Sequence, residues 1–162
     1  MGMRKVALIT DGWRRLFTYA WPAGILQRIR ETGEDVNLYI FNSTGNWSRD
    51  AGYNRAEYNI YNLPELSDFD GIILELNNIS SPAVLADVIS NAKRSGRPVV
   101  SIANELGDFY YVGIDNYSAM KQVIAHLHEV HDCKKFWLLV GAQDNYESSC
   151  RLQGCLLYTS PS

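Results

Sequence analysis

Apolar and polar residues between positions 110 and 141 follow a pattern that predicts a strand, a helix and a second strand. Tyr110 to Ile114 is a short run of β-forming residues. The predicted helix has apolar residues at the spacing of one buried face: Met120, Val123, Ile124, Leu127 and Val130. Asp115 or Asn116 can cap its start, because either side-chain oxygen can accept a first-turn N–H. Phe136 to Val140 is an unbroken apolar run before Gly141, which predicts a parallel strand covered on both sides.

The first hundred residues show the same alternation of strands and helices. Four further strands are predicted at Lys5–Thr10, Val36–Phe41, Ile72–Leu76 and Val99–Ile102. Helices are predicted at Tyr19–Glu31, Arg55–Leu63 and Pro82–Ser95. Pro22 is expected in the first turn of the first helix, where its missing N–H costs nothing. This order predicts the α/β fold class, with a Rossmann-like parallel sheet flanked by helices.

Composition excludes several classes of protein. The chain has 162 residues, of which 46% are hydrophobic and 20% charged, so it can bury a globular core. A formal net charge of -3 and the lack of a basic cluster argue against nucleic-acid contact. The first apolar run, Val6 to Thr10, is too short for a signal peptide or a membrane span, which leaves the cytoplasm as the expected location. The three cysteines have neither metal spacing nor a disulfide pattern.

The last eight residues, Cys155 to Ser162, have the sequence C-L-L-Y-T-S-P-S. Codons that encode this string resemble the mosaic end of a transposon sequencing adapter. We therefore expect an artefact tail, and a natural sequence that continues beyond Gly154. The alternative is a genuine but frayed terminus.

A family resemblance rests on V-x-x-D-N, a later H-L, a further His, an apolar strand ending in Gly, and R-x-x-G. The matching residues are Val112, Asp115, Asn116, His126, Leu127, His131, Gly141, Arg151 and Gly154. Together with D-G-I-I from Asp70, this order resembles the sensor domain of lactose-repressor-like and galactose-repressor-like regulators, over Lys5 to Gly154. Val130 and Lys121 depart from the family pattern, because each replaces a usual Gly.

The resemblance implies the type I periplasmic-binding-protein fold, in which two α/β lobes hold a small ligand between them. On that basis residues 1–132 are expected to form the N-terminal lobe, residues 133–154 the beginning of a truncated second lobe, and residues 155–162 the artefact tail. The second lobe is expected to begin with a strand at Lys135–Val140 and the start of a helix at Ser148–Gly154. The resemblance leaves a homodimer of the intact protein open.

Ligands of open α/β sheets bind at the carboxyl ends of the strands, where loops and helix N-termini converge. The loops expected there are rich in amides, carboxylates and aromatic rings, which suit a sugar-like ligand. The candidate binding residues are Asp11, Trp13, Arg14, Phe17, Asn42, Trp47, Asn77, Asn104, Asp115 and Asn116. Each has a plainer interpretation: Asp115 and Asn116 as helix caps, the loop aromatics as cover for the core edge, and Arg14 as a solvated surface group.

Catalytic and metal chemistry find little support in the sequence. His126 and His128 would point to nearly opposite faces of a helix, so no metal site is expected. No nucleotide-binding loop or catalytic triad is present, and nothing near Cys150 would lower its pKa. We therefore expect a sensor domain for a small polar ligand, without cofactor, membrane or catalysis of its own.

The output of such a sensor would be transcriptional control or a fused signalling enzyme. The first strand starts about four residues into the chain, which leaves no room for a helix-turn-helix headpiece before it. This favours a C-terminal output such as a diguanylate cyclase. The alternative function is a small flavodoxin-like α/β enzyme or cofactor-binding domain. It is disfavoured because D-G-W-R-R-L-F after the first strand is poor in phosphate-cradling Ser, Thr and Gly.

Overall fold

The structure is a computed structural model that describes residues 2–12, 16–44, 48–77, 79, 81–141 and 145–159, with the backbone alone for 16–18 and 157–159. The chain divides into two compact units, residues 1–112 and residues 113–162, and each is described by itself. The lobes expected at 1–132 and 133–154 remain a prediction. None of the described helices has the length and apolar character needed to cross a membrane.

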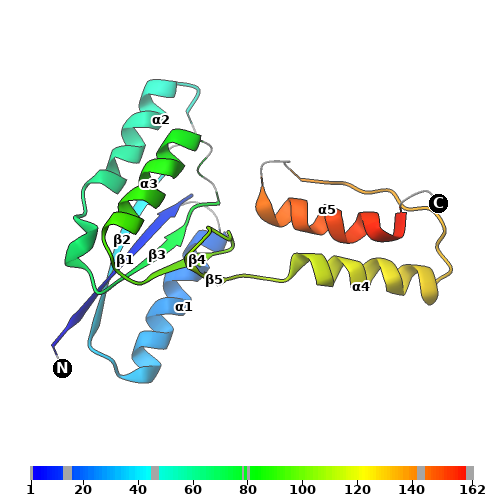
Figure 1. Cartoon of the computed structure of the whole chain (residues 1–162), viewed down its shortest axis with the longest axis horizontal. Coiled ribbons are helices and arrows are strands. Elements are labelled where there is room, and N and C mark those ends of the chain that lie inside the picture. The colour runs from blue at the N-terminus through cyan, green and yellow to red at the C-terminus, as the bar shows by residue number, and fades with distance from the viewer. Residues whose placement is uncertain are drawn as a thin grey trace. The chain divides into compact units, whose positions relative to one another are not determined.

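The first unit is built on a five-stranded sheet whose strands are all parallel. The strands are β1 (Arg4–Asp11), β2 (Val36–Ser43), β3 (Gly71–Glu75), β4 (Val99–Ile102) and β5 (Tyr110–Val112). Their order across the sheet is β2-β1-β3-β4-β5, so β1 pairs with β2 on one side and with β3 on the other (Figure 1). The predicted α/β fold with a parallel sheet is confirmed.

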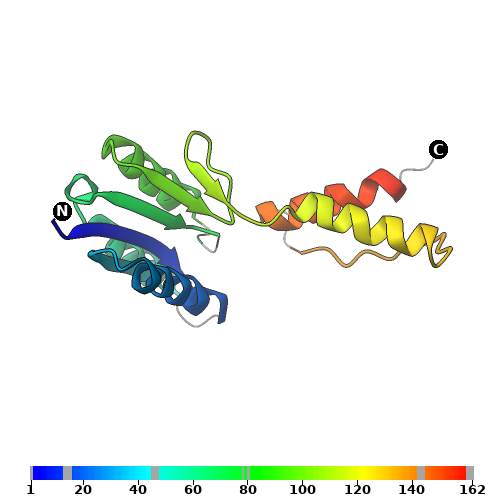
Figure 2. The same cartoon turned by 90° about the horizontal axis from the view of Figure 1, so that it is seen from below.

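Helices cover both faces of this sheet, as Figure 2 shows. The helices of the first unit are α1 (Leu16–Thr32), α2 (Ala51–Glu57) and α3 (Pro82–Arg94), with short 3-10 helices η1 (Tyr58–Asn62) and η2 (Leu66–Asp68). The main core lies between the sheet and the layer of α3, η1 and η2, and includes Ile9, Leu74, Tyr61 and Val88. Leu74 is completely buried, and such burial of one leucine contributes about 2 kcal/mol.

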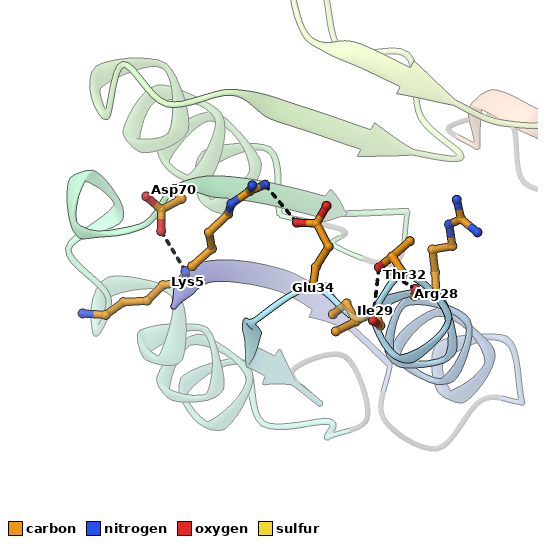
Figure 3. Close-up of polar contacts among 7 residues, drawn as sticks. Lys5, Arg28, Ile29, Thr32, Glu34 and Asp70 are labelled. Carbon is orange, nitrogen blue, oxygen red and sulfur yellow. Dashed lines mark hydrogen bonds and ion pairs between the residues drawn. The ribbon is translucent and has the colours of Figure 1, made fainter. Parts of the chain in front are cut away.

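Hydrogen bonds and an ion pair fix the amino ends of the central strands. The Asp70 carboxylate accepts the Lys5 N–H at 2.8 Å (Figure 3). The Asp70 N–H donates back to the Lys5 carbonyl, also at 2.8 Å. Nearby, the partly exposed Arg4 and Glu34 side chains form an ion pair at 3.2 Å, a type that contributes at most about 1 kcal/mol. The D-G-I-I segment therefore has a structural role, since Asp70 sets where β3 begins beside β1.

Helix α1 differs from its predicted start. It begins at Leu16 rather than at Tyr19, which places Pro22 inside the helix instead of in its first turn. The proline therefore removes one backbone hydrogen bond from the helix interior. At the other end, the Thr32 hydroxyl donates to the Arg28 and Ile29 carbonyls, each at 3.1 Å (Figure 3).

The second unit consists of helices α4 (Asn116–Glu129) and α5 (Tyr146–Thr159), which pack against each other. The predicted strand at Phe136–Val140 is wrong: no described residue of this unit belongs to a sheet. The physical reason is that a strand needs a hydrogen-bonded neighbour. Trp137 and Leu139 are fully exposed on this unpaired segment.

Helix α5 continues through the sequence that resembles an adapter. It passes Gly154 without a break and ends at Thr159, and Cys155 keeps only 3% of its surface exposed. Burial raises the pKa of the Cys155 thiol. At least one residue of the tail, Cys155, is therefore part of the packed structure, while the origin of the tail as an artefact remains a prediction.

Gly154 marks the closest approach of the two helices. A Cβ atom at this position would lie 2.5 Å from the Tyr117 carbonyl oxygen and 3.3 Å from the Lys121 nitrogen. Both are backbone atoms of α4, which cannot turn away as a flexible side chain could. Only glycine fits here without separating α4 from α5.

We predict that Gly154→Ala destabilises the second unit by about 1–3 kcal/mol, because the added methyl group forces the two helices apart. Urea unfolding followed by circular dichroism measures the change. The matched control is Gln153→Ala on the exposed neighbouring position of α5, which should change stability by less than about 0.5 kcal/mol. Equal stability of Gly154→Ala and the unmodified chain would contradict this packing.

Candidate ligand-binding site

Buried polar residues gather where the central strands end. The middle residues of β1 and β3 are apolar. By contrast, β1 ends in Thr10 and Asp11, β2 in Ser43 and β3 in Glu75, and each of these residues is at most 4% exposed. Because the strands are parallel, these ends lie at one edge of the sheet (Figure 1). Buried polar groups are costly unless they form hydrogen bonds, either within the protein or with a ligand.

Thr10 and Glu75 form the centre of this group. They are register partners in β1 and β3, so their side chains share one face of the sheet. The Thr10 hydroxyl donates to Glu75 Oε2 at 2.8 Å, and both groups are buried. A hydrogen bond to a buried carboxylate is stronger than one between neutral groups, so it joins the two strands firmly.

Tyr61 of η1 contributes the third group. Its hydroxyl donates to the Thr10 carbonyl at 2.9 Å in the interior. Burial raises the pKa of Tyr61 far above its ordinary value, the negative charge of Asp11 raises it further, and a hydrogen bond with the Ser43 side chain lowers it in part. Tyr61 is therefore a neutral hydrogen-bond donor at physiological pH.

Asp11 and Asn42 present oxygen acceptors at the same edge. Asp11 is 1% exposed and pairs in register with Ser43, while Asn42 pairs with Thr10. Asn42 Oδ1 is buried, and no hydrogen-bond donor reaches it within the parts of the chain that the structure describes. A buried acceptor without a donor costs about 1–3 kcal/mol, so this oxygen is suited to accept a further hydrogen bond.

The ends of β3 and β4 carry two further candidates. Asn77 is half-buried in the turn after β3. The hydroxyl of Ser101, within β4, donates to the carbonyl of Asn104 in the loop that follows at 2.5 Å, and Asn104 is half-buried as well. Ala103 between them has a φ of 62°, a left-handed conformation that is costly for a residue with a Cβ. Strained backbone conformations of this kind are common at ligand-binding and active sites.

Asp115 and Asn116 belong to the second unit, at the start of α4. The Asp115 carboxylate caps the helix by accepting the Ser118 N–H at 2.9 Å, and this bond holds the pKa of Asp115 below its usual value. Asn116 Oδ1 accepts from Arg151 Nη1 of α5 at 2.9 Å, and its Nδ2 donates to the Ile114 carbonyl at 3.3 Å. Both side chains thus have structural partners, and their contact with a ligand remains a prediction.

Trp13, Arg14 and Trp47 lie outside the described residues, and so does the side chain of Phe17. Sequence analysis also missed four members of the buried group, namely Thr10, Ser43, Tyr61 and Glu75. Glu75 carried a usable signal, since it is the charged end of the otherwise apolar run I-I-L-E. Nothing in the local pattern distinguishes Tyr61 from the neighbouring tyrosine, Tyr58.

A hollow of about 420 Å³ lies away from these strand ends, between η2 and the end of α3. Its lining is polar, but several of these polar groups already form hydrogen bonds within the protein. Arg94 donates to Asn91 Oδ1, Glu65 accepts from the Ser67 hydroxyl at 2.7 Å, and Arg97 donates to the Ser67 carbonyl at 2.9 Å. The polar groups of this hollow are therefore less available to a ligand than the buried Asn42 oxygen is.

No protein-family model and no curated protein sequence matches the chain. Solved structures do resemble it. A solute-binding protein of an ABC transporter from Burkholderia multivorans has a TM-score of 0.67 at 20% identity, over 98% of this chain and 57% of that one. The transcription regulator CcpA of Lactococcus lactis has a TM-score of 0.66 at 19% identity, over 99% and 56%. A periplasmic solute-binding protein from Actinobacillus succinogenes, with bound D-allose, has a TM-score of 0.68 at 16% identity, over 96% and 54%.

These likenesses establish the fold. The chain has the α/β architecture of the type I periplasmic-binding-protein-like fold. It spans about half the length of the solved structures that it matches.

We predict that Thr10→Val lowers the free energy of unfolding of the first unit by about 1–3 kcal/mol, because the buried Glu75 carboxylate loses a donor while the side-chain volume stays the same. Thr10→Ser keeps the hydroxyl and should cost less. Urea denaturation measures both variants. If the valine variant were as stable as the serine variant, the Thr10–Glu75 hydrogen bond would not contribute to the stability of the first unit.

A second prediction concerns alkaline pH. The pKa of Tyr61 is raised in the folded state above the 10.0 of an ordinary tyrosine, so the unfolded chain loses this proton first. Stability due to Tyr61 is therefore complete below pH 10 and falls as the pH rises further. In Tyr61→Phe the loss of stability between about pH 9 and pH 11 should be smaller than in the unmodified chain. Tyr19→Phe, at a side chain that is 57% exposed, is the control and should follow the unmodified chain.

Proposed function

We propose that the chain is part of a ligand-sensing domain that binds a small, polar, sugar-like molecule at the carboxyl ends of its strands. The observation that carries this proposal is the buried Asn42 oxygen, which lacks a donor among the described residues. It lies in register with Thr10 and one position from Ser43, within the buried polar group that ends the central strands. A ligand hydroxyl would supply the missing donor.

The chemistry of this edge favours a polyol over a phosphate ligand. A sugar hydroxyl both donates and accepts, and carboxylate and amide oxygens are its natural acceptors. Asp11 and Glu75 bring two carboxyl groups to the same strand ends. Carboxylates repel phosphate, so a flavodoxin-like domain that binds a phosphorylated cofactor is disfavoured.

The ligands in neighbouring structures support the same class of molecule. One similar protein was solved with bound D-allose and another with D-xylulofuranose. A third is described as a glucose-galactose binding protein from Geobacillus stearothermophilus. These are properties of those proteins, and with identities of 16–20% they support the ligand class of this chain only by analogy.

The role of the sensor in the full-length protein is also a proposal. The neighbours include transcription regulators as well as solute-binding proteins, and the motif resemblance favours the regulators. We propose a regulatory protein in the cytoplasm whose output is transcriptional control or a fused signalling enzyme such as a diguanylate cyclase. Asp115 and Asn116 would add contacts to the ligand, and this segment would do no chemistry itself.

Ligand-observed NMR with D-allose and D-glucose tests the binding site, because it detects dissociation constants as weak as about 1 mM, equivalent to about -4 kcal/mol. We predict weak, saturable binding of at least one of the two sugars. Asn42→Leu should weaken it about tenfold or more, since the apolar replacement cannot accept the ligand hydroxyl.

The matched control is Asn37→Leu on the same strand. Asn37 is exposed and lies near the amino end of β2, so its replacement should leave sugar binding unchanged. Loss of binding in both variants, or in neither, would count against the proposed site.

A further inference from the structure

Two histidines of the family motif, His126 and His131, face each other in the second unit. His126 lies in the last turn of α4, and His131 follows the end of that helix. Their Nε2 atoms are 3.2 Å apart, the ring centroids are 4.9 Å apart, and the ring planes cross at 76°. Both residues are exposed, so the pair is open to solvent.

The turn after α4 holds this pair in place. The Val130 N–H donates to the His126 carbonyl at 2.9 Å, and the Cys133 N–H donates to the Leu127 carbonyl at 3.1 Å. Asp132 adopts a left-handed φ of 53°, which turns the chain back toward the helix. His131 is therefore brought to His126 by a defined backbone turn rather than by the chance orientation of two long side chains.

The third histidine has a different partner. His128 Nδ1 lies 3.2 Å from the Cys133 carbonyl oxygen, so this ring contacts the backbone of the same turn. Sequence analysis rejected a metal because His126 and His128 would diverge on the helix. The structure pairs His126 with a residue beyond the helix end, which helical periodicity does not address.

The separation of the two Nε2 atoms fits a shared metal ion. Zinc binds imidazole nitrogen at about 2.0–2.1 Å in tetrahedral geometry, which places two ligand nitrogens about 3.3 Å apart. The two Nε2 atoms are 3.2 Å apart, so a small rotation of either side chain would bring them to the separation of two zinc ligands. In the metal-free pair, one Nε2 must carry the proton that the other accepts; a metal ion takes the place of that proton.

We propose that His126 Nε2 and His131 Nε2 together bind a divalent transition-metal ion of the Zn²⁺ class. No group of three His, Cys, Asp or Glu side chains suited to a metal occurs among the described residues, so water completes the coordination. Asp132, the nearest acidic side chain along the turn, is paired with Lys134. The ion links the end of α4 to the turn that follows it and stabilises the second unit.

Titration calorimetry of the whole chain with ZnCl₂ tests this site. The unmodified chain should bind one ion saturably, and Mg²⁺, which prefers oxygen ligands, should not bind. His126→Gln and His131→Gln should each weaken Zn²⁺ binding about tenfold or more, because each removes one of two protein ligands. Zn²⁺ should also raise the melting temperature of the unmodified chain but not of these two variants.

Two controls separate the pair from its neighbours. His128→Gln and Cys133→Ser should retain the affinity, since neither group belongs to the proposed ligands. Circular dichroism confirms that each variant is folded before titration. The proposal is overturned if the unmodified chain shows no saturable binding, if His131→Gln binds as well as the unmodified chain, or if Cys133→Ser abolishes binding.

Discussion

The hydrogen bond between the Thr10 hydroxyl and the Glu75 carboxylate, 2.8 Å long and fully buried, is the constraint on which the first unit depends. It joins the two central strands through two buried polar groups, each of which would be costly without a partner. Tyr61 adds a donor to the Thr10 carbonyl from the helical layer, so strand pairing and helix packing meet at one residue. The rest of the strand-end group, including Asp11 and Asn42, is arranged around this fixed point.

The alternation of apolar runs predicted the sheet well because period and length are local properties. Strand β4 was placed at Val99–Ile102 without error, and β2 differed only by two residues at its end. The error at Phe136–Val140 is of another kind, since a strand exists only with a partner and no sequence window contains that partner. Pro22 shows a third kind, because a helix can accept an internal proline at the cost of one hydrogen bond.

The candidate site was predicted by location more than by residue. Parallel topology places loops and strand ends at one edge, and that rule led to Asp11 and Asn42. It did not lead to Thr10 or Tyr61, because their importance comes from contacts across 65 and 51 positions of sequence. Asp115 illustrates the opposite difficulty: its cap on α4 is predictable locally and accounts for the residue without a ligand.

The motif residues of the second unit explain one another. The side chain of Asn116, in the D-N pair, accepts a hydrogen bond from Arg151 of the R-x-x-G motif. Gly154 of the same motif lacks a Cβ, which lets the α4 backbone pack directly against α5. Two short patterns separated by some thirty residues thus describe one helix-helix interface. A residue pattern that suggests ligand binding can serve packing at the same positions.

The unpaired segment at Phe136–Val140 affects how the chain behaves among other molecules. Trp137 and Leu139 expose their whole side chains, and no sheet neighbour occupies their backbone donors and acceptors within the described residues. An extended apolar run of this kind is a template for adding a strand from another chain. The same five residues that predict a buried strand therefore present an open edge at which a second molecule can add a strand.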